Sequence, residues 1–201
     1  MKVLVLDTET LGLQDRRIYD LGYLIYDTAD GSTLKMRDYI IKQVYDNPDL
    51  MNSAYYKNKL PIYEQRLADG YCKKCYWGTA LKTLLNDIKN YQVDGIYAYN
   101  SKFDERAINE TCKRFNRENP LDGILDIMDY ISPITETEDY KEFCRKNNYL
   151  TKHRPPQTQR KAETLFRYLM KQTDYQEEHT ALEDSKIELN ILMVALGYSL
   201  V

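Results

Sequence analysis

The sequence predicts an α/β protein, and three observations carry that prediction. The first is a series of apolar, strand-like segments at 2–6, 18–27 and 33–43, joined by short turns as in an antiparallel meander. The second is a helical apolar stripe over 79–91 that is followed by a short strand at 95–99. The third is bulk composition: 201 residues, 43% hydrophobic and 29% charged, are enough for a single domain, 1–201, with a substantial core.

Two carboxylates, Asp7 and Glu9, close the first strand. Side chains two residues apart on a strand point to the same face, so these two acids lie side by side. Each disfavours ionisation of the other, and a hard divalent cation held between them removes the conflict. On these two residues alone, the ordinary alternative is a turn-forming aspartate beside a solvated glutamate.

The segment at about 45–76 interrupts the strand pattern, and we interpret it as a helical insertion with short helices at 48–57 and 62–69. Connections of this length are often lids or binding elements. Its interleaved lysines and tyrosines suit contact with a nucleic acid strand, and the alternative is a helical elaboration without a ligand. These residues are Lys57, Lys59, Lys73, Lys74, Tyr55, Tyr56, Tyr71 and Tyr76.

Two further carboxylates begin helices. Asp104 lies in the first turn of a helix predicted over 102–115, where an open α/β sheet presents ligand groups, and a capping role beside Ser101 is the alternative. Thr180 begins the sequence T-x-x-E, the signature of a helix start, which puts Asp184 in the first turn. His179 then lies just outside that helix, where it can lean toward the same site.

The region between these helices contains two more candidate features. Asp126, in a short apolar stretch at 123–128, is either a partner of a metal site or a helix cap. The basic loop at 152–161, which Pro155 and Pro156 make rigid, is a candidate for phosphate contacts, with a solvated connector as the alternative. Further helices are expected at 137–147 and 162–170.

Composition limits the function classes. A net charge of −3 neither indicates nor excludes nucleic acid binding, because bound metal offsets the negative charge of a carboxylate cluster locally. No apolar run approaches a membrane span and the N-terminus lacks a secretory pattern, so we expect a cytoplasmic protein without a membrane partner. Cys72 and Cys75 have metal-ligand spacing but lack two further ligands, so we expect reduced thiols rather than a zinc site.

Asp7, Glu9, Asp104 and Asp184 form a set of four carboxylates, and His179 adds a group whose pKa is ordinarily near neutrality. Such a set suits two divalent ions, Mg²⁺ or Mn²⁺, about 4 Å apart. One ion would orient and activate a water that the imidazole deprotonates, and the other would stabilise the departing oxygen. The chemistry indicated is in-line hydrolysis of a phosphodiester.

Three stretches, LDTETLG, YNSKFDERAI and EHTALEDSKIE, resemble the exonuclease motifs of the DEDDh family, the DnaQ-like 3′–5′ exonucleases that include polymerase proofreading subunits. They occur in the family's order, with all five catalytic residues present. A sister group uses tyrosine four residues before the last aspartate, where this chain has Thr180. One departure is Leu11, which replaces a threonine of the family's D-T-E-T-T-G and would give a more apolar floor beside the terminal nucleotide. The resemblance implies an RNase H-like fold, with a mixed five-stranded sheet of three antiparallel and two parallel strands flanked by helices.

The resemblance also implies a function, a metal-dependent exonuclease acting at the 3′ end of single-stranded nucleic acid, with DNA favoured. An exoribonuclease trimming short RNA and a non-catalytic nucleic-acid-binding module are the alternatives, and a polymerase or replication protein is a candidate partner. By the same resemblance, Glu9 also touches the 3′-hydroxyl, Thr10 approaches it through its backbone, and Leu13 wedges against the last base. Phe103 and Arg160 are further candidate substrate contacts.

Overall fold

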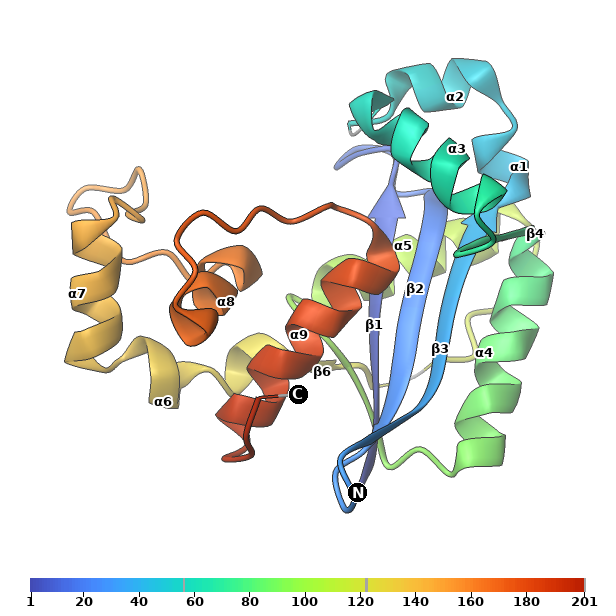
Figure 1. Ribbon diagram of the computed structural model, residues 1–201. Helices are drawn as coiled ribbons and strands as arrows, with labels where there is room; N and C mark the ends of the chain where they lie inside the picture. The colour runs from blue at the N-terminus through green and yellow to red at the C-terminus, as the bar shows by residue number, and fades with distance from the viewer. Residues whose placement is uncertain (56, 122, 201) are drawn as a thin grey trace.

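The computed structural model describes residues 1–55, 57–121 and 123–200, and its centre is a six-stranded mixed sheet in the order β4-β3-β2-β1-β5-β6 (Figure 1). The long strands β1 (Lys2–Thr10), β2 (Ile18–Asp27) and β3 (Ser32–Ile41) form the predicted antiparallel meander. Short β5 (Gly95–Ala98) and β6 (Leu125–Asp126) continue the sheet in parallel beyond β1. The α/β class and the mixed sheet are therefore confirmed.

The prediction of five strands is wrong, because β4 (Lys73–Cys75) adds a sixth, parallel to β3 at the opposite edge. These three residues show no apolar alternation, and they form a strand only because β3 offers them an edge. The third strand also ends at Ile41 rather than Gln43, because the chain turns there into α1 (Lys42–Tyr45). Gln43 is thereby free to accept a hydrogen bond from the backbone N–H of Trp77, at 2.7 Å.

The helices flank the sheet, and those for which both bounds were predicted begin and end within two residues of them, with one exception. The exception is the helix predicted at 48–57, which ends at Ser53. The further helical elements are α2 (Pro48–Ser53), η1 (Lys57–Lys59), α3 (Leu60–Ala68), α4 (Trp77–Tyr91), α5 (Lys102–Arg114), η2 (Ile127–Asp129), α6 (Ser132–Thr135), α7 (Glu138–Lys146), α8 (Ala162–Met170) and α9 (Ala181–Ala195). Within the described ranges, none of them is long and apolar enough to cross a lipid bilayer.

Alternation along the strands divides the core into two layers, one on each face of the sheet. Leu4 and Leu6 of β1 belong to the layer that includes residues of α4 and α5. Val3 and Val5 point the other way, into the layer that includes residues of α8 and α9. Figure 1 shows α9 beside β1, on the side of the sheet opposite α4, with α6 to α8 lying farther out on the α9 side. Asp7 and Glu9 share the alternation of Val3 and Val5, so they face the α9 layer.

Helix α9 approaches β2 closely at Gly22. A Cβ built at Gly22 would lie 2.1 Å from the backbone nitrogen of Leu182 and 2.2 Å from the carbonyl carbon of Ala181. The Ser185 hydroxyl lies 3.3 Å from the Gly22 carbonyl oxygen, within reach to donate. In the β1–β2 register Gly22 pairs with Asp7. The missing side chain therefore lets the first turn of α9 sit against the strand pair that carries Asp7.

Candidate active site

Strand β1 supplies the first two acids of the site. Glu9 is buried, with 8% of its surface exposed, and Asp7 is half-buried. Burial, followed by the charges of Asp104 and Glu177, raises the pKa of Asp7 well above its usual range. Burial and the charges of Asp7 and Asp184 do the same to the pKa of Glu9. The charge of Asp7 thus disfavours the ionisation of Glu9, in line with the strand pattern.

Asp104 enters the site from the first turn of α5 and is 2% exposed. Its Oδ1 accepts a hydrogen bond from the Thr8 hydroxyl at 2.7 Å, which ties α5 to β1. Burial raises the pKa of Asp104 to about 7, although the Thr8 hydrogen bond acts in the other direction. The Ser101 side chain makes no capping hydrogen bond within the described chain, so the capping arrangement does not account for this acid.

Asp184 lies in the first turn of α9, where its backbone N–H donates to the Thr180 carbonyl at 3.0 Å. Thr180 is the N-cap residue, as predicted, yet its side chain makes no capping hydrogen bond to the described residues. Burial, then Asp7 and Glu177, raise the pKa of Asp184 to about 9. Its Oδ1 is buried and has no hydrogen-bond partner among residues 1–55, 57–121 and 123–200.

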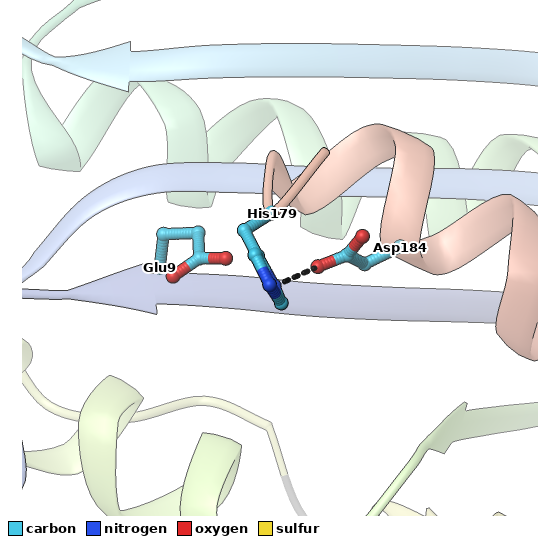
Figure 2. A group of neighbouring side chains, drawn as sticks. All are labelled: Glu9, His179 and Asp184. Carbon is cyan, nitrogen blue, oxygen red and sulfur yellow. Dashed lines mark ion pairs between the residues drawn. The ribbon is translucent and has the colours of Figure 1, made fainter. Parts of the chain in front are cut away.

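His179 lies between Glu9 and Asp184 (Figure 2). One ligand atom from each of these three residues lies within 4.8 Å of the other two. The imidazole Nδ1 is 3.9 Å from Asp184 Oδ2 and 3.7 Å from Glu177 Oε2, and the side chain is 30% exposed, so it reaches solvent. Burial and then the charge of Lys59 lower the pKa of His179 below its ordinary value. The ring is therefore neutral at pH 7 and can accept a proton.

Two acids at this site were missed by sequence reasoning. Glu188 follows Asp184 by one helical turn in α9, is 4% exposed, and accepts a hydrogen bond from the backbone N–H of Tyr99 at 3.2 Å. Burial comes first among the causes that raise its pKa, followed by Asp7, Asp104 and Asp184. Its i, i+4 spacing from Asp184 was the available signal. Glu177, whose pKa burial raises to about 7, lies in the loop before α9 and gave no signal.

Three observations indicate that these residues are suited to hold divalent cations. The charges of neighbouring acids from β1, α5 and α9 raise the pKa values of Asp7, Glu9, Asp184 and Glu188, a conflict that a cation resolves. Asp184 Oδ1, which is buried without a hydrogen-bond partner in the described part of the chain, is an oxygen for which a cation would be an ordinary partner. Glu9, His179 and Asp184 form a group whose ligand atoms are close enough to share one ion.

The candidate substrate residues are distributed around these acids. Thr10 ends β1 and is 5% exposed, whereas Leu13, in the following loop, is 75% exposed. Phe103 is half-buried beside Asp104 in sequence. Arg160 is exposed, and its carbonyl accepts a hydrogen bond from the Tyr99 hydroxyl. The apolar floor expected from Leu11 is absent from the described surface, because its side chain is 3% exposed and belongs to the core.

Two other predicted features take clear positions. Asp126 is a cap, since its Oδ1 accepts hydrogen bonds from the backbone N–H groups of Met128 and Asn100, both at 2.9 Å. In the 45–76 segment the side chains of Tyr55, Tyr71 and Tyr76 are exposed. Tyr56, named with them as a candidate nucleic acid contact, lies outside the described residues.

A mixed sheet flanked by helices, with acids gathered at the end of β1, is an RNase H-like α/β fold. The chain is similar to a solved nuclease domain, that of 3′hExo, a DEDDh family member crystallised bound to rAMP, with a TM-score of 0.56. The likeness covers 100% of this chain and 94% of that one at 10% identity, and it shows the DEDDh exonuclease fold. No protein-family model and no curated protein sequence matches the chain.

Proposed function

We propose that this protein is a metal-dependent nuclease that removes nucleotides from the 3′ end of single-stranded nucleic acid. The observation that carries the proposal is the gathering of Glu9, His179 and Asp184 within 4.8 Å of one another. Asp7 and Asp104 stand close enough to alter the pKa values of this group. The DEDDh exonuclease fold of the chain supports the same function.

In this proposal Asp7, Glu9, Asp104 and Asp184 hold two ions, Mg²⁺ or Mn²⁺. When bound, such ions neutralise the acids, activate the attacking water and stabilise the departing oxygen. Thr8 keeps Asp104 oriented through its hydrogen bond. His179 acts as the general base, because it is neutral and reaches solvent.

Two acidic side chains face the imidazole that receives the proton. The imidazolium would face two carboxylate oxygens, on Glu177 at 3.7 Å and on Asp184 at 3.9 Å. A charge that develops during the reaction is stabilised best by groups already in place. The same two acids can later accept or guide the proton as it leaves to solvent through the exposed edge of the ring.

The substrate contacts remain those proposed from the sequence: Glu9 and Thr10 at the 3′-hydroxyl, Leu13 against the last base, and Phe103 and Arg160 further along the strand. The 75% exposure of Leu13 supports a wedge, because an apolar side chain that is largely exposed is available to a base. We propose DNA as the substrate, with a polymerase or replication protein as partner. An exoribonuclease is the second candidate, favoured because the similar nuclease domain was crystallised with rAMP.

The proposal is tested by digesting 5′-labelled DNA and RNA oligonucleotides with Mg²⁺ or Mn²⁺. We expect a ladder that shortens stepwise from the 3′ end, and the two substrates report the sugar preference. His179→Ala should lower the rate by about 10²–10⁴-fold, the usual contribution of a general base. Equal turnover by this variant would contradict the mechanism. Binding without hydrolysis by the wild type would favour the non-catalytic module instead.

A further inference from the structure

Helix α3 of the 45–76 segment contacts the loop that carries His179. The Tyr63 hydroxyl lies 3.0 Å from Asp20 Oδ2 and 3.2 Å from the His179 carbonyl oxygen. It carries one hydrogen, which it donates between these two acceptors. Tyr63 is 1% exposed, so this contact is shielded from water. Figure 1 shows α3 at the end of the sheet where β1 ends and α9 begins.

Arg66, one turn further along α3, reaches both sides of the same loop. Its guanidinium donates to Asp38 Oδ2 at 2.7 Å and lies 3.7 Å from Glu178 and 3.6 Å from Glu183. Glu178 precedes His179, and Glu183 is in the first turn of α9. The arginine and Asp38 side chains are 13% and 1% exposed, so water screens this pair little, whereas Glu178 is 55% exposed and its pair is the weakest of the three. Helix α3 therefore contacts residues on both sides of His179 in the sequence.

The His179 backbone needs such support. Its φ of +55° lies in the left-handed region, which residues with a side chain rarely adopt. A residue keeps this conformation only when its surroundings fix it. Asp20 contributes from β2, because its Oδ2 also accepts a hydrogen bond from the Ala181 backbone N–H at 2.9 Å. Tyr63 and Asp20 thus hold both ends of the His179–Ala181 turn.

We propose that Tyr63 and Arg66 are positioning residues for His179, and that the 45–76 segment serves to hold the general base in place. The same segment also contacts the stretch from Glu9 to Leu13, where the terminal nucleotide is proposed to bind, since the Tyr55 backbone N–H donates to the Leu11 carbonyl at 2.9 Å. It therefore links the end of β1, where the terminal nucleotide would bind, to the imidazole that deprotonates the water. This inference rests on the proposed role of His179.

Tyr63→Phe is the sharpest variant. It removes only the hydroxyl and keeps the aromatic packing against Tyr19 and Tyr45, whose ring centroids lie 5.6 and 6.1 Å away. We expect kcat to fall about 5–20-fold, with KM changed less than twofold, because the turn loses a buried hydrogen bond while the substrate surface stays intact. Arg66→Lys should act in the same direction, since lysine keeps the charge but loses the planar fork.

Tyr45→Phe is the matched control. Tyr45 belongs to the same aromatic cluster, and its buried hydroxyl has no hydrogen-bond partner in the described part of the chain. This variant should keep the kcat of the wild type. Equal losses in Tyr45→Phe and Tyr63→Phe would overturn the inference, because they would indicate a general packing defect.

A second readout is independent of activity. The chain has two histidines, His153 and His179, so imidazole carbon resonances in a histidine-labelled sample are readily assigned. At fixed pH, Tyr63→Phe should shift the His179 resonance and leave that of His153 in place, and Tyr45→Phe should move neither. If the wild type hydrolyses nothing, the proposed function fails, yet this shift still supports the positioning contact. An unmoved His179 resonance together with an unchanged kcat would overturn it.

Discussion

Replacing Gly22 with alanine would force α9 away from β2, and the size of the effect follows from the contact distances. The added Cβ would lie 2.1 Å from the Leu182 backbone nitrogen, whereas ordinary van der Waals contact begins at 3.4 Å. The helix must therefore retreat by about 1.3 Å, because the obstructing atoms are backbone and cannot rotate away. Overpacking of this kind typically costs about 1–3 kcal/mol. For a chain of 201 residues that corresponds to about 2–12 °C in Tm.

The same displacement should disable the site. Asp184 lies in the first turn of α9 and His179 just before it, so both move with the helix, while Asp7, opposite Gly22 in the register, stays. A misplacement of about 1 Å costs on the order of 10²-fold in rate. We therefore expect Gly22→Ala to lower kcat about 100-fold in the oligonucleotide assay, at a temperature where circular dichroism shows the variant to be folded.

Gly78→Ala is the matched control for this experiment. The three atoms nearest to its Cβ would all belong to the guanidinium of Arg117, at 2.6–2.7 Å, and that flexible side chain can move aside. Because Gly78 lies in α4, alanine should leave Tm unchanged or raise it. A Gly22→Ala protein with the Tm and kcat of the wild type would refute the close packing of α9 on β2 at Gly22. A lowered Tm with full activity would refute the link between that packing and the active site.

Three further predictions concern the acids and the wedge. The Tm of the metal-free protein should be lower at pH 8 than at pH 5.5, because the folded-state pKa values of Asp104 (about 7) and Asp184 (about 9) exceed their unfolded values. The folded chain then binds more protons than the unfolded chain, so its stability falls as pH rises through that window; a Tm that stays level or rises in EDTA would contradict this. Mn²⁺ at 100 times its Kd should raise the free energy of unfolding by about 2.7 kcal/mol and Tm by about 5–10 °C. Asp7→Asn should abolish this gain and should raise the Tm of the metal-free protein at pH 8. Thermal scans with and without the ion would measure both effects. Leu13→Ala should leave Tm within about 2 °C, because the side chain is 75% exposed, but should raise KM several-fold for oligonucleotides; an unchanged KM would exclude the wedge.

Features encoded locally were predictable from the sequence. The alternation of Val3 to Leu6 fixed the strand and the face of Asp7, because the side-chain period of a strand is two. The T-x-x-E signature at Thr180 placed the start of α9 correctly, although the Thr180 side chain makes no capping hydrogen bond to any residue that the structure describes. Glu183 instead forms ion pairs with Lys186 and Arg66. The boundary was right because several residue preferences agree there, even though one expected hydrogen bond does not form.

Features that depend on distant pairing were not predictable. Strand β4 has no periodicity of its own and exists through its pairing with β3. Glu188 has the composition of a surface position, and only the packing of α9 buries it beside the acids of β1 and α5. The contact of Tyr63 with His179 joins residues 116 positions apart, and no local pattern signals such a contact. A single sequence carries the residues of such contacts without indicating that they meet.

The metal site itself is tested most directly by a crystal of the wild-type protein soaked in Mn²⁺, with anomalous difference density as the measurement. We expect peaks among the carboxylates of Asp7, Glu9, Asp104 and Asp184, with the imidazole of His179 beside them, and no such peaks in an Asp7→Ala crystal soaked identically. Density confined to other surface acids, or none at saturating Mn²⁺, would contradict the assignment of these residues as a catalytic metal centre.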